Sequence, residues 1–353
     1  MLVFNHVVAK LLLLVLLGSN LEANQGSLAN AEKVVVNYEG RLMTSQDAGT
    51  TWQNISAGLP EYSTIKDIAF GKSKIYVGYN KDSIFSKDLA STDQWQVEDL
   101  DMYMVNQSVG KMLSRIFTTN KNIYAEVIFG KLFRKASRSH AYWQPLDKPD
   151  EYQVISELKE DAKENVFIAT SYGLFVSKDD CKSWQHIFKM ATVFDFEIID
   201  NEIFVSSNQG IFSSHDMGQN WQAHNLVHDG FKMVNHQANS YKFIATNHEL
   251  IAIKDYNVRS LLNNIRIQSF NLKEKKWAIH PANNYVGSLP FANSIVIEGN
   301  NIYCGYAEGI VLSQDNGKKW TKILNYNAKD NNSALKIIKA NGAIYCVEVS
   351  GGC

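Results

Sequence analysis

The stretch that decides the fold runs from Ser45 to Trp52 and reads Ser-Gln-Asp-Ala-Gly-Thr-Thr-Trp. The same pattern, S-x-D-x-G-x-x-W, returns three more times without gaps, with a cysteine in place of the glycine once. These copies are Ser177-Lys-Asp-Asp-Cys-Lys-Ser-Trp184, Ser214-His-Asp-Met-Gly-Gln-Asn-Trp221 and Ser313-Gln-Asp-Asn-Gly-Lys-Lys-Trp320. Degenerate copies end at Trp95, Trp143 and Trp277, so these copies together account for every tryptophan in the chain.

The spacing of the tryptophans indicates a repeat architecture. Six intervals separate Trp52 from Trp320, and they average about 45 residues, which is the period of a propeller blade. Short strands rich in β-branched and aromatic residues precede each motif in the same order. The sequence therefore predicts an all-β fold, a single β-propeller of about seven four-stranded blades over residues 24–353.

The chemistry of the motif is that of a tight turn. An aspartate carboxylate can accept hydrogen bonds from nearby backbone N–H groups. Glycine supplies a positive φ, and tryptophan opens the next strand and buries a large apolar surface. The motif is therefore interpreted as the anchor of a hairpin, with no catalytic chemistry of its own.

Each repeat predicts an inner strand followed by a second strand. The inner strands are expected at 65–70, 111–117, 152–158, 193–199, 295–297 and 335–338. The second strands are expected at 34–38, 75–79, 123–127, 166–170, 203–207, 243–246 and 302–306. The first repeat lacks an inner strand, so we expect Leu335 to Ile338 to supply it and close the ring. A further strand, Ile344 to Val349, leaves open seven blades or seven plus a fragment.

The sixth repeat departs most from the pattern. Lys254 to Lys276 lies between its expected third strand and Trp277 and is far longer than the other turns. Long excursions in compact domains are often functional or mobile. The apolar residues Leu261, Leu262 and Ile265 equally suit a segment that covers an edge of the fold.

The N-terminus indicates export. Lys10 precedes the apolar run Leu11 to Leu17, and small and polar residues follow up to Ala23. This pattern suits a signal peptide over residues 1–23 and a secreted or periplasmic protein; a buried strand or an uncleaved anchor is the alternative. No later segment is apolar enough to span a membrane.

Composition excludes some classes of function. Lysine and arginine are scattered and the net charge is −1, so nucleic acid is not an expected partner. The four cysteines form no CxxC pair, and we expect no bond between Cys304 and Cys346 and a reactive thiol at Cys353. His228, His248 and His280 could meet near one face, but they form no tight ligand motif, so neither a metal nor a cofactor is expected.

The four motifs resemble the Asp-box (BNR) repeat of sialidase-like propellers. In size and strand order the chain is most similar to the photosystem II stability/assembly factor-like propellers, and the resemblance covers about residues 33–349. It implies a propeller that binds partners and performs no catalysis. Fold alone does not fix function, so site residues must decide.

A sialidase site would need features that this sequence lacks. The resemblance implies three arginines that grip a carboxylate and a Tyr/Glu nucleophile pair. The chain has only six arginines, Arg41, Arg115, Arg134, Arg138, Arg259 and Arg266. The nearest string to an Arg-Ile-Pro motif is Ser114-Arg-Ile-Phe117, which follows the first Asp box and has no proline. A glycoside hydrolase of sialidase type remains the alternative function.

The expected binding face carries the turns between second and third strands. An aromatic residue recurs there and suits contact with a sugar or peptide, although packing between blades is the alternative. These candidate binding residues are Tyr38, Tyr79, Phe129, Tyr172 and Tyr306. Acidic residues at the same turns, Glu39, Asp82, Glu249 and Glu308, either line this face or are solvated. We therefore expect a monomeric, exported, non-catalytic module for a protein or carbohydrate partner.

Overall fold

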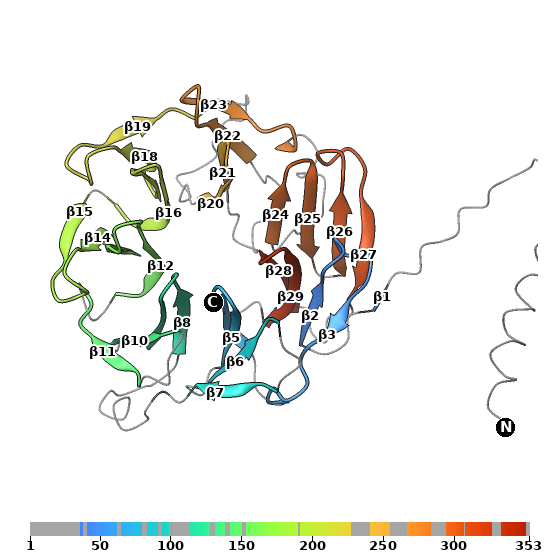
Figure 1. Cartoon of the computed structure of the whole chain (residues 1–353). Coiled ribbons are helices and arrows are strands. Elements are labelled where there is room, and N and C mark those ends of the chain that lie inside the picture. The colour runs from blue at the N-terminus through green and yellow to red at the C-terminus, as the bar shows by residue number, and fades with distance from the viewer. Residues whose placement is uncertain are drawn as a thin grey trace, which may run out of the picture. The chain divides into compact units, whose positions relative to one another are not determined.

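The computed structural model describes residues 36–37, 41–61, 65–79, 83–90, 94–98, 100, 113–127, 131–137, 142–149, 153–189, 191–226, 241–254, 267–283, 294–306, 308–326 and 333–350. The chain divides into two compact units, Met1–Val34 and Val35–Cys353, and the description concerns the second. Its described strands form seven sheets, arranged as the blades of a propeller around an axis (Figure 1). The predicted all-β propeller is confirmed, and the count is seven blades.

Six blades are built from consecutive antiparallel strands, with the innermost strand first in the chain. Blade 2 comprises β4 (Ile65–Phe70), β5 (Lys74–Tyr79), β6 (Ile84–Asp88) and β7 (Gln96–Glu98). Blade 3 comprises β8 (Leu113–Thr118), β9 (Asn122–Val127), β10 (Leu132–Ala136) and β11 (Gln144–Leu146). Blade 4 comprises β12 (Ile155–Glu160), β13 (Val166–Thr170), β14 (Gly173–Ser177) and β15 (Gln185–Phe188). Blade 5 comprises β16 (Val193–Ile199), β17 (Glu202–Ser207), β18 (Gly210–Ser214) and β19 (Gln222–His224). Blade 6 comprises β20 (Tyr241–Ala245), β21 (Glu249–Lys254), β22 (Ile267–Asn271) and β23 (Lys276–Ile279). Blade 7 comprises β24 (Ser294–Glu298), β25 (Asn301–Tyr306), β26 (Gly309–Ser313) and β27 (Thr321–Asn325).

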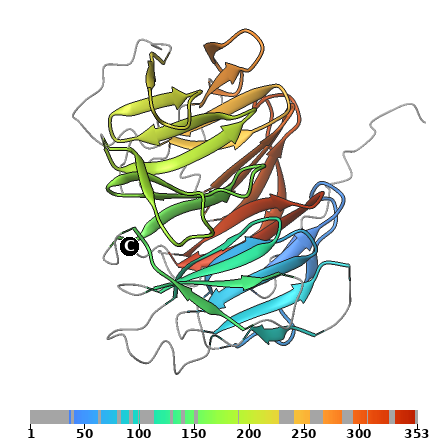
Figure 2. The same ribbon diagram turned by 60° about the vertical axis from the view of Figure 1, so that its left-hand side comes forward.

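Blade 1 joins the two ends of the propeller unit. Its order is β28 (Ser333–Ala340), β29 (Ala343–Ser350), β2 (Leu42–Ser45) and β3 (Gln53–Asn54). The red C-terminal strands and the blue N-terminal strands therefore lie side by side in one sheet (Figures 1 and 2). The prediction that the C-terminus supplies the inner strand of the first blade is confirmed.

The predicted second strand of blade 1 is wrong. Val34 to Tyr38 was expected there, but β29 occupies that position and pairs with β2 in the register Leu42↔Val347. The described part of the N-terminal stretch is β1 (Val36–Asn37), which pairs in parallel with the outer strand β27 of blade 7. The strand at Ile344 to Val349 is therefore the second strand of blade 1 and does not begin an eighth blade.

Blade 6 corrects a second prediction. Phe243 to Thr246 was expected as a second strand, but β20 is the innermost strand and β21 is the second. The expected excursion Lys254 to Lys276 contains the third strand, β22, and a turn into β23. Residues 255–266, with Leu261, Leu262 and Ile265, lie outside the described residues. The strand β20 resembles the second strands of the other repeats because its sequence, Tyr-Lys-Phe-Ile-Ala, is rich in aromatic and aliphatic residues.

The core lies between neighbouring blades. Second strands such as β13 and β17 are buried along their whole length, because each has a blade on both faces. One cluster combines Tyr76 of blade 2 with Ile116 and Phe133 of blade 3. Apolar area buried in this way stabilises the fold by roughly 25 cal/mol per Å².

The repeated turns share one hydrogen-bond pattern. In the first, the carboxylate of Asp47 accepts from the backbone N–H of Thr51 at 2.8 Å and from its hydroxyl at 2.7 Å. The hydroxyl of Ser45 donates to Asp47 at 2.9 Å and accepts from Gly49 N at 2.7 Å. The other turns bond in the same way through Ser177 and Asp179, Ser214 and Asp216, and Ser313 and Asp315. The serine therefore bridges both halves of the turn, a role that the sequence pattern had left unexplained.

The tryptophans of the turns also reach the preceding blade. The indole N–H of Trp221 donates to Ile187 O at 2.8 Å, and that of Trp95 donates to Ile55 O at 2.9 Å. Trp52 and Trp184 make equivalent bonds to Ile323 O and Asp147 O, at 3.2 and 2.9 Å. The motif is thus more than the local hairpin anchor expected from the sequence, because it also joins blades.

Candidate functional site

The predicted aromatic residues differ in how far their side chains are exposed. Tyr79 is 1% exposed and packs edge to face against Phe85, with ring centroids 5.6 Å apart. Its ring belongs to the core and offers no exposed face, as the packing alternative held. Tyr306 is part-buried, with Lys322 Nζ 5.8 Å from its ring centroid. Tyr172 is 57% exposed, while Tyr38 and Phe129 lie outside the described residues.

Tyr172 sits at the tip of the turn between β13 and β14. The hydroxyl of Thr170 accepts a hydrogen bond from Tyr172 N at 3.0 Å, which shapes the turn. The Tyr172 carbonyl lies 2.9 Å from Nε2 of His186, whose ring stacks on Phe175 at 4.1 Å. Burial lowers the pKa of His186, so the ring favours its neutral form near pH 7. A donating Nε2–H on this neutral ring would hold the backbone beneath the exposed tyrosine.

A neighbouring link between blades extends this surface. The side chain of Gln153 accepts a hydrogen bond from the hydroxyl of Ser171, and the hydroxyl of Thr192 donates to Ser171 O at 2.9 Å. Val154 follows Gln153 and is 45% exposed. We call this patch the blade-4 surface; its members are Gln153, Val154, Ser171, Tyr172, His186 and Thr192. An exposed aromatic ring and an exposed aliphatic side chain on two segments joined by a hydrogen bond can contact a peptide or a sugar.

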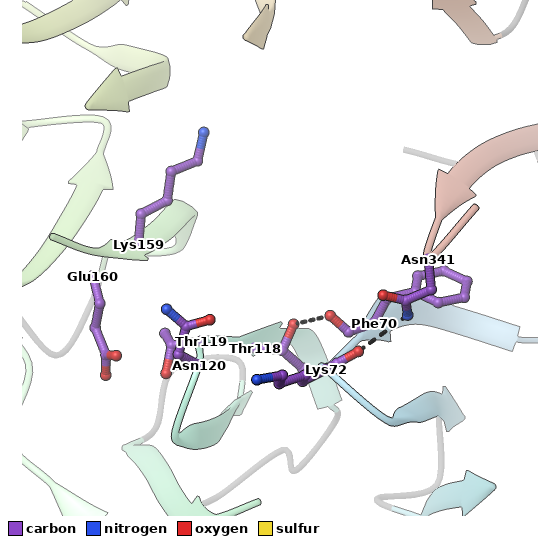
Figure 3. A pocket seen from close by; sticks show the side chains of 9 residues that line it. Phe70, Lys72, Thr118, Thr119, Asn120, Lys159, Glu160 and Asn341 are labelled. Atoms are coloured by element: carbon purple, nitrogen blue, oxygen red, sulfur yellow. Dashed lines mark hydrogen bonds between the residues drawn. The ribbon is translucent and has the colours of Figure 1, made fainter. Parts of the chain in front are cut away.

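A hollow of about 490 Å³ lies at the turns between first and second strands of blades 1 to 4. The sequence does not mark these turns as a site, because their short polar segments resemble ordinary solvated turns. The residues that line the hollow are Phe70, Gly71, Lys72, Thr118, Thr119, Asn120, Lys159, Glu160 and Asn341. Figure 3 shows that they come from four separate elements and surround one space.

Hydrogen bonds between blades hold the wall of the hollow. The hydroxyl of Thr118 donates to Phe70 O at 2.7 Å, and Asn341 Nδ2 donates to Gly71 O at 3.3 Å (Figure 3). Glu160 Oε1 accepts from the Tyr124 hydroxyl at 3.1 Å. These bonds engage donors as well as acceptors, because the Thr118 hydroxyl and the Asn341 amide each donate to a carbonyl of blade 2.

Lys159 and Glu160 point in opposite directions from the end of β12 (Figure 3). Lys159 Nζ donates to Phe196 O at 2.6 Å and to Glu197 Oε1 at 2.5 Å, and lies 3.8 Å from Asp195. Burial alone would lower the pKa of Lys159, but these carboxylates raise it above its ordinary value. Lys159 is therefore a charged, fully paired side chain between blades 4 and 5.

The arginines that a sialidase site would need bind three separate partners. Arg41 donates to Pro60 O at 2.7 Å and Arg115 to Ser156 O at 3.1 Å. Arg134 forms a bidentate ion pair with Asp180, a residue of the blade-4 repeat turn. Arg138, Arg259 and Arg266 lie outside the described residues.

Other candidate residues are dispersed. Glu39, Asp82 and His228 lie outside the described residues, Glu249 is part-buried, and Glu308 and His248 are exposed. His280 is buried, and its Nδ1 accepts from Ala282 N at 3.1 Å. Within the described ranges, no three histidine, cysteine, aspartate or glutamate side chains gather as a metal site would require.

The described cysteines lie in the core. Cys181, Cys304 and Cys346 are buried free thiols, and Cys353 lies beyond the described residues. Among the residues with a described structure, no helix is long and apolar enough to cross a membrane.

Comparison with known proteins identifies the fold. No protein-family description matches the chain, and no curated protein sequence matches it. The structure is similar to YCF48 bound to D1 peptide, with a TM-score of 0.53 and 13% identity over 90% of this chain and 99% of that one. A streptogramin B lyase gives 0.54 and 11% over 80% of this chain and 93% of the lyase. An ancestral GH74 enzyme gives 0.52 and 15% over 82% of this chain and 48% of the enzyme. At these identities the likeness shows the β-propeller fold alone.

Proposed function

We propose that this chain is an exported Asp-box propeller that binds a polypeptide or glycan partner without catalysis, using the blade-4 surface. The observation that carries the proposal is the exposure of Tyr172 and Val154, at 57% and 45%, on one hydrogen-bonded patch. The rigid aromatic ring costs little conformational entropy on binding and offers an apolar face with a polar tip. We also propose that Tyr306, on the corresponding turn of blade 7, makes a secondary contact with the partner.

The similarity to a propeller solved with a peptide supports the polypeptide half of this proposal. YCF48 was solved with D1 peptide, which establishes peptide binding for that protein. Because fold does not determine function, this similarity favours a polypeptide partner in general and identifies no particular one.

The alternative function is a glycoside hydrolase of sialidase type. The similarity to an ancestral GH74 enzyme shows that propellers of this kind also occur in enzymes. Against it, Arg41, Arg115 and Arg134 are engaged by three different partners. A carboxylate held in the sialidase manner would need such arginines to converge.

The test measures binding to immobilised panels of glycans and of extended peptides. We expect Tyr172→Ala to weaken the tightest interaction by about tenfold or more, as the loss of a binding hot spot would. The matched control is Tyr142→Ala, because Tyr142 is 88% exposed but lies on a turn between third and fourth strands. Equal loss in both variants, or none in either, would remove the blade-4 surface from the proposal.

Hydrolysis and export are tested separately. Turnover of a fluorogenic sialoside panel that disappears when Arg41, Arg115 or Arg134 is changed would establish the enzyme alternative. N-terminal sequencing of exported protein should find a chain that begins after Ala23. A mature chain that retains Met1 would contradict the export proposal.

A further inference from the structure

A deeply buried ion pair joins blade 3 to the link that leads into blade 4. Glu126 lies on the second strand β9, and Lys148 lies on the link after β11. Lys148 Nζ is 3.1 Å from Glu126 Oε1, and the two side chains are 2% and 1% exposed. In every other ion pair of the described residues, one side chain is at least 16% exposed. Charges so far from water contribute little net stability, because the cost of desolvation offsets their attraction.

Glu126 occupies a position at which five other blades carry smaller residues. In the pairing register of first and second strands, its counterparts are Gly78, Ala169, Ser206, Gly305 and Val347. Side chains there face the inner strand of the next blade, since Ser206 Oγ accepts from Tyr241 N at 2.8 Å. The space is narrow, because a Cβ on Gly78 would lie 2.3 Å from Leu113 Cδ2. A long carboxylate in such a place needs a partner, and the link supplies it as Lys148.

The pair holds the backbone on both sides of Val154. Lys148 Nζ donates to Gln153 O at 2.9 Å, and Glu126 Oε1 accepts from Ile155 N at 3.0 Å. The carbonyl before Val154 and the amide after it are thus bound to one buried pair of charges. Val154 is 45% exposed and is the aliphatic member of the blade-4 surface.

Two further bonds connect the link to the turn that carries Tyr172. Trp184 Nε1 donates to Asp147 O at 2.9 Å, which ties the start of the link to blade 4. The side chain of Gln153 accepts a hydrogen bond from the hydroxyl of Ser171, the residue before Tyr172. A continuous set of contacts therefore runs from the core of blade 3, through the link, to the exposed turn of blade 4.

The contact made by Glu126 depends on Lys148. Burial raises the pKa of Glu126, and Lys148 and the Ile155 amide oppose this rise. The second carboxylate oxygen, Oε2, is buried and has no hydrogen-bond partner within the part of the chain that the structure describes. Removal of Lys148 would therefore leave a poorly satisfied buried carboxylate and weaken both bonds to the link.

We propose that Glu126 and Lys148 are positioning residues for the blade-4 surface. They fix where the link presents Val154 relative to the turn of Tyr172, and neither of them contacts the partner. The inference rests on the function proposed for that surface, but the position of the link can be measured without any partner.

The first test compares hydrogen–deuterium exchange of the full-length chain in Lys148→Met and in Lys135→Met. Each change removes a lysine that is paired with a buried glutamate, so both variants should lose Tm. We expect residues 153–156 and 170–173 to exchange about tenfold faster or more in Lys148→Met alone, the effect of losing a charge-assisted hydrogen bond. Equal acceleration in both variants, or none in Lys148→Met, would overturn the proposal.

A conservative substitution separates the hydrogen bonds from the packing. Glu126→Gln keeps an oxygen that can accept from Lys148 Nζ and Ile155 N, whereas Glu126→Leu removes both contacts. Exchange of residues 153–156 should stay close to that of the parent chain in Glu126→Gln and become about tenfold faster in Glu126→Leu. The same exchange rates in the two variants would contradict a positioning role.

Binding is measured separately on immobilised panels of extended peptides and glycans. Lys148→Met should weaken by about tenfold the interaction that Tyr172→Ala weakens, and Lys135→Met should leave it unchanged. An interaction that depends on Tyr172 but not on Lys148 would refute the positioning role and leave the binding surface standing. If no panel member binds the parent chain, the proposed function fails, while the exchange measurements still decide whether the pair positions the link.

Discussion

The junctions between blades fall into two kinds. At four of them a tryptophan N–H donates to a carbonyl of the preceding blade, as Trp221 does to Ile187. At the other three, the indole nitrogens of Trp143, Trp277 and Trp320 are buried without a hydrogen-bond partner in the described residues. Two of these three junctions carry an ion pair with a buried glutamate, Lys135–Glu98 and Lys275–Glu202.

The difference shows that one motif does not imply one contact. Trp320 ends a complete copy of the motif and lacks the indole bond, whereas Trp95 ends a degenerate copy and makes it. Ion pairs are not confined to the junctions without the indole bond, because Lys159–Glu197 crosses the junction at which Trp221 makes it. Charge pairing and indole bonding are therefore separate contributions to holding adjacent sheets in register. The predictions below separate their contributions.

The first effect is expected at an ion-pair junction. Lys135→Met leaves Glu98, which is 8% exposed, with Ser86 at 2.6 Å and Lys74 at 3.8 Å. We expect a loss of about 2 kcal/mol in the free energy of unfolding, less than for a fully buried pair because partners remain. Chemical denaturation measures it. The control is Lys131→Met, whose exposed pair with Asp147 should cost under about 1 kcal/mol; similar losses in both variants would contradict the distinction.

The next effect concerns how closely the repeat turn approaches the preceding blade. Gly218 has φ +84°, and a Cβ there would lie 2.6 Å from Ile187 Cβ. Gly342 has nearly the same φ, +79°, and no atom within 4 Å of such a Cβ. Both alanine variants should lose about 1 kcal/mol or more for the left-handed backbone, and Gly218→Ala should lose about 1–3 kcal/mol beyond that. Equal Tm values for the two variants would show that the turn can move away from its neighbour.

The indole bond itself should contribute less. Trp221→Phe removes the bond to Ile187 O, while Trp277→Phe removes an N–H that has no partner among the described residues. Both changes remove the same atoms, and Trp277 is the more buried of the two, so a greater loss in Trp221→Phe is due to the bond and should be about 1 kcal/mol. Urea denaturation of the two variants decides this, and a larger loss in Trp277→Phe would reverse the interpretation.

The smallest effect is the pH dependence of the repeat turns. Backbone and side-chain donors at Thr51 and Asn220 lower the pKa of Asp47 and Asp216 to about 2. A depressed folded-state pKa gives stability that is complete above the ordinary value near 4 and is lost as pH falls toward 2. The Tm should therefore fall across this window, and less so in an Asp47→Asn, Asp216→Asn double variant. Parallel pH profiles would contradict the assignment.

The fold could be predicted because tryptophan marks the same position in every blade. The prediction of strand order was wrong where the strands lack such a marker. Val36 and Asn37 have the composition of a second strand, yet β29 from the other end of the chain competes for that place and forms a longer ladder. In blade 6, the innermost strand Tyr241–Ala245 resembled a second strand, and the assignment of the whole blade shifted by one strand.

The candidate sites were harder to predict. Tyr79 and Tyr172 occupy similar turns, but their exposures are 1% and 57%, because exposure depends on which neighbouring blade covers the ring. The hollow combines turns from four blades, and no local pattern links Lys72 to Asn341. Nor does any local pattern state that Lys159 has a carboxylate partner, since Glu197 belongs to another blade.

Blade 1 sets the order in which the molecule can be completed. The hydroxyl of Thr44 donates to Ile344 O, and 300 residues separate the two in the sequence. During synthesis, β2 and β3 emerge long before β28 and β29, and their strand edge stays unpaired until those strands have been made. Loops of this length fold slowly because closure precedes any gain from contact. A chain shortened at its C-terminus by premature termination would hence leave the first blade permanently open, and a quality-control protease could recognise that exposed edge.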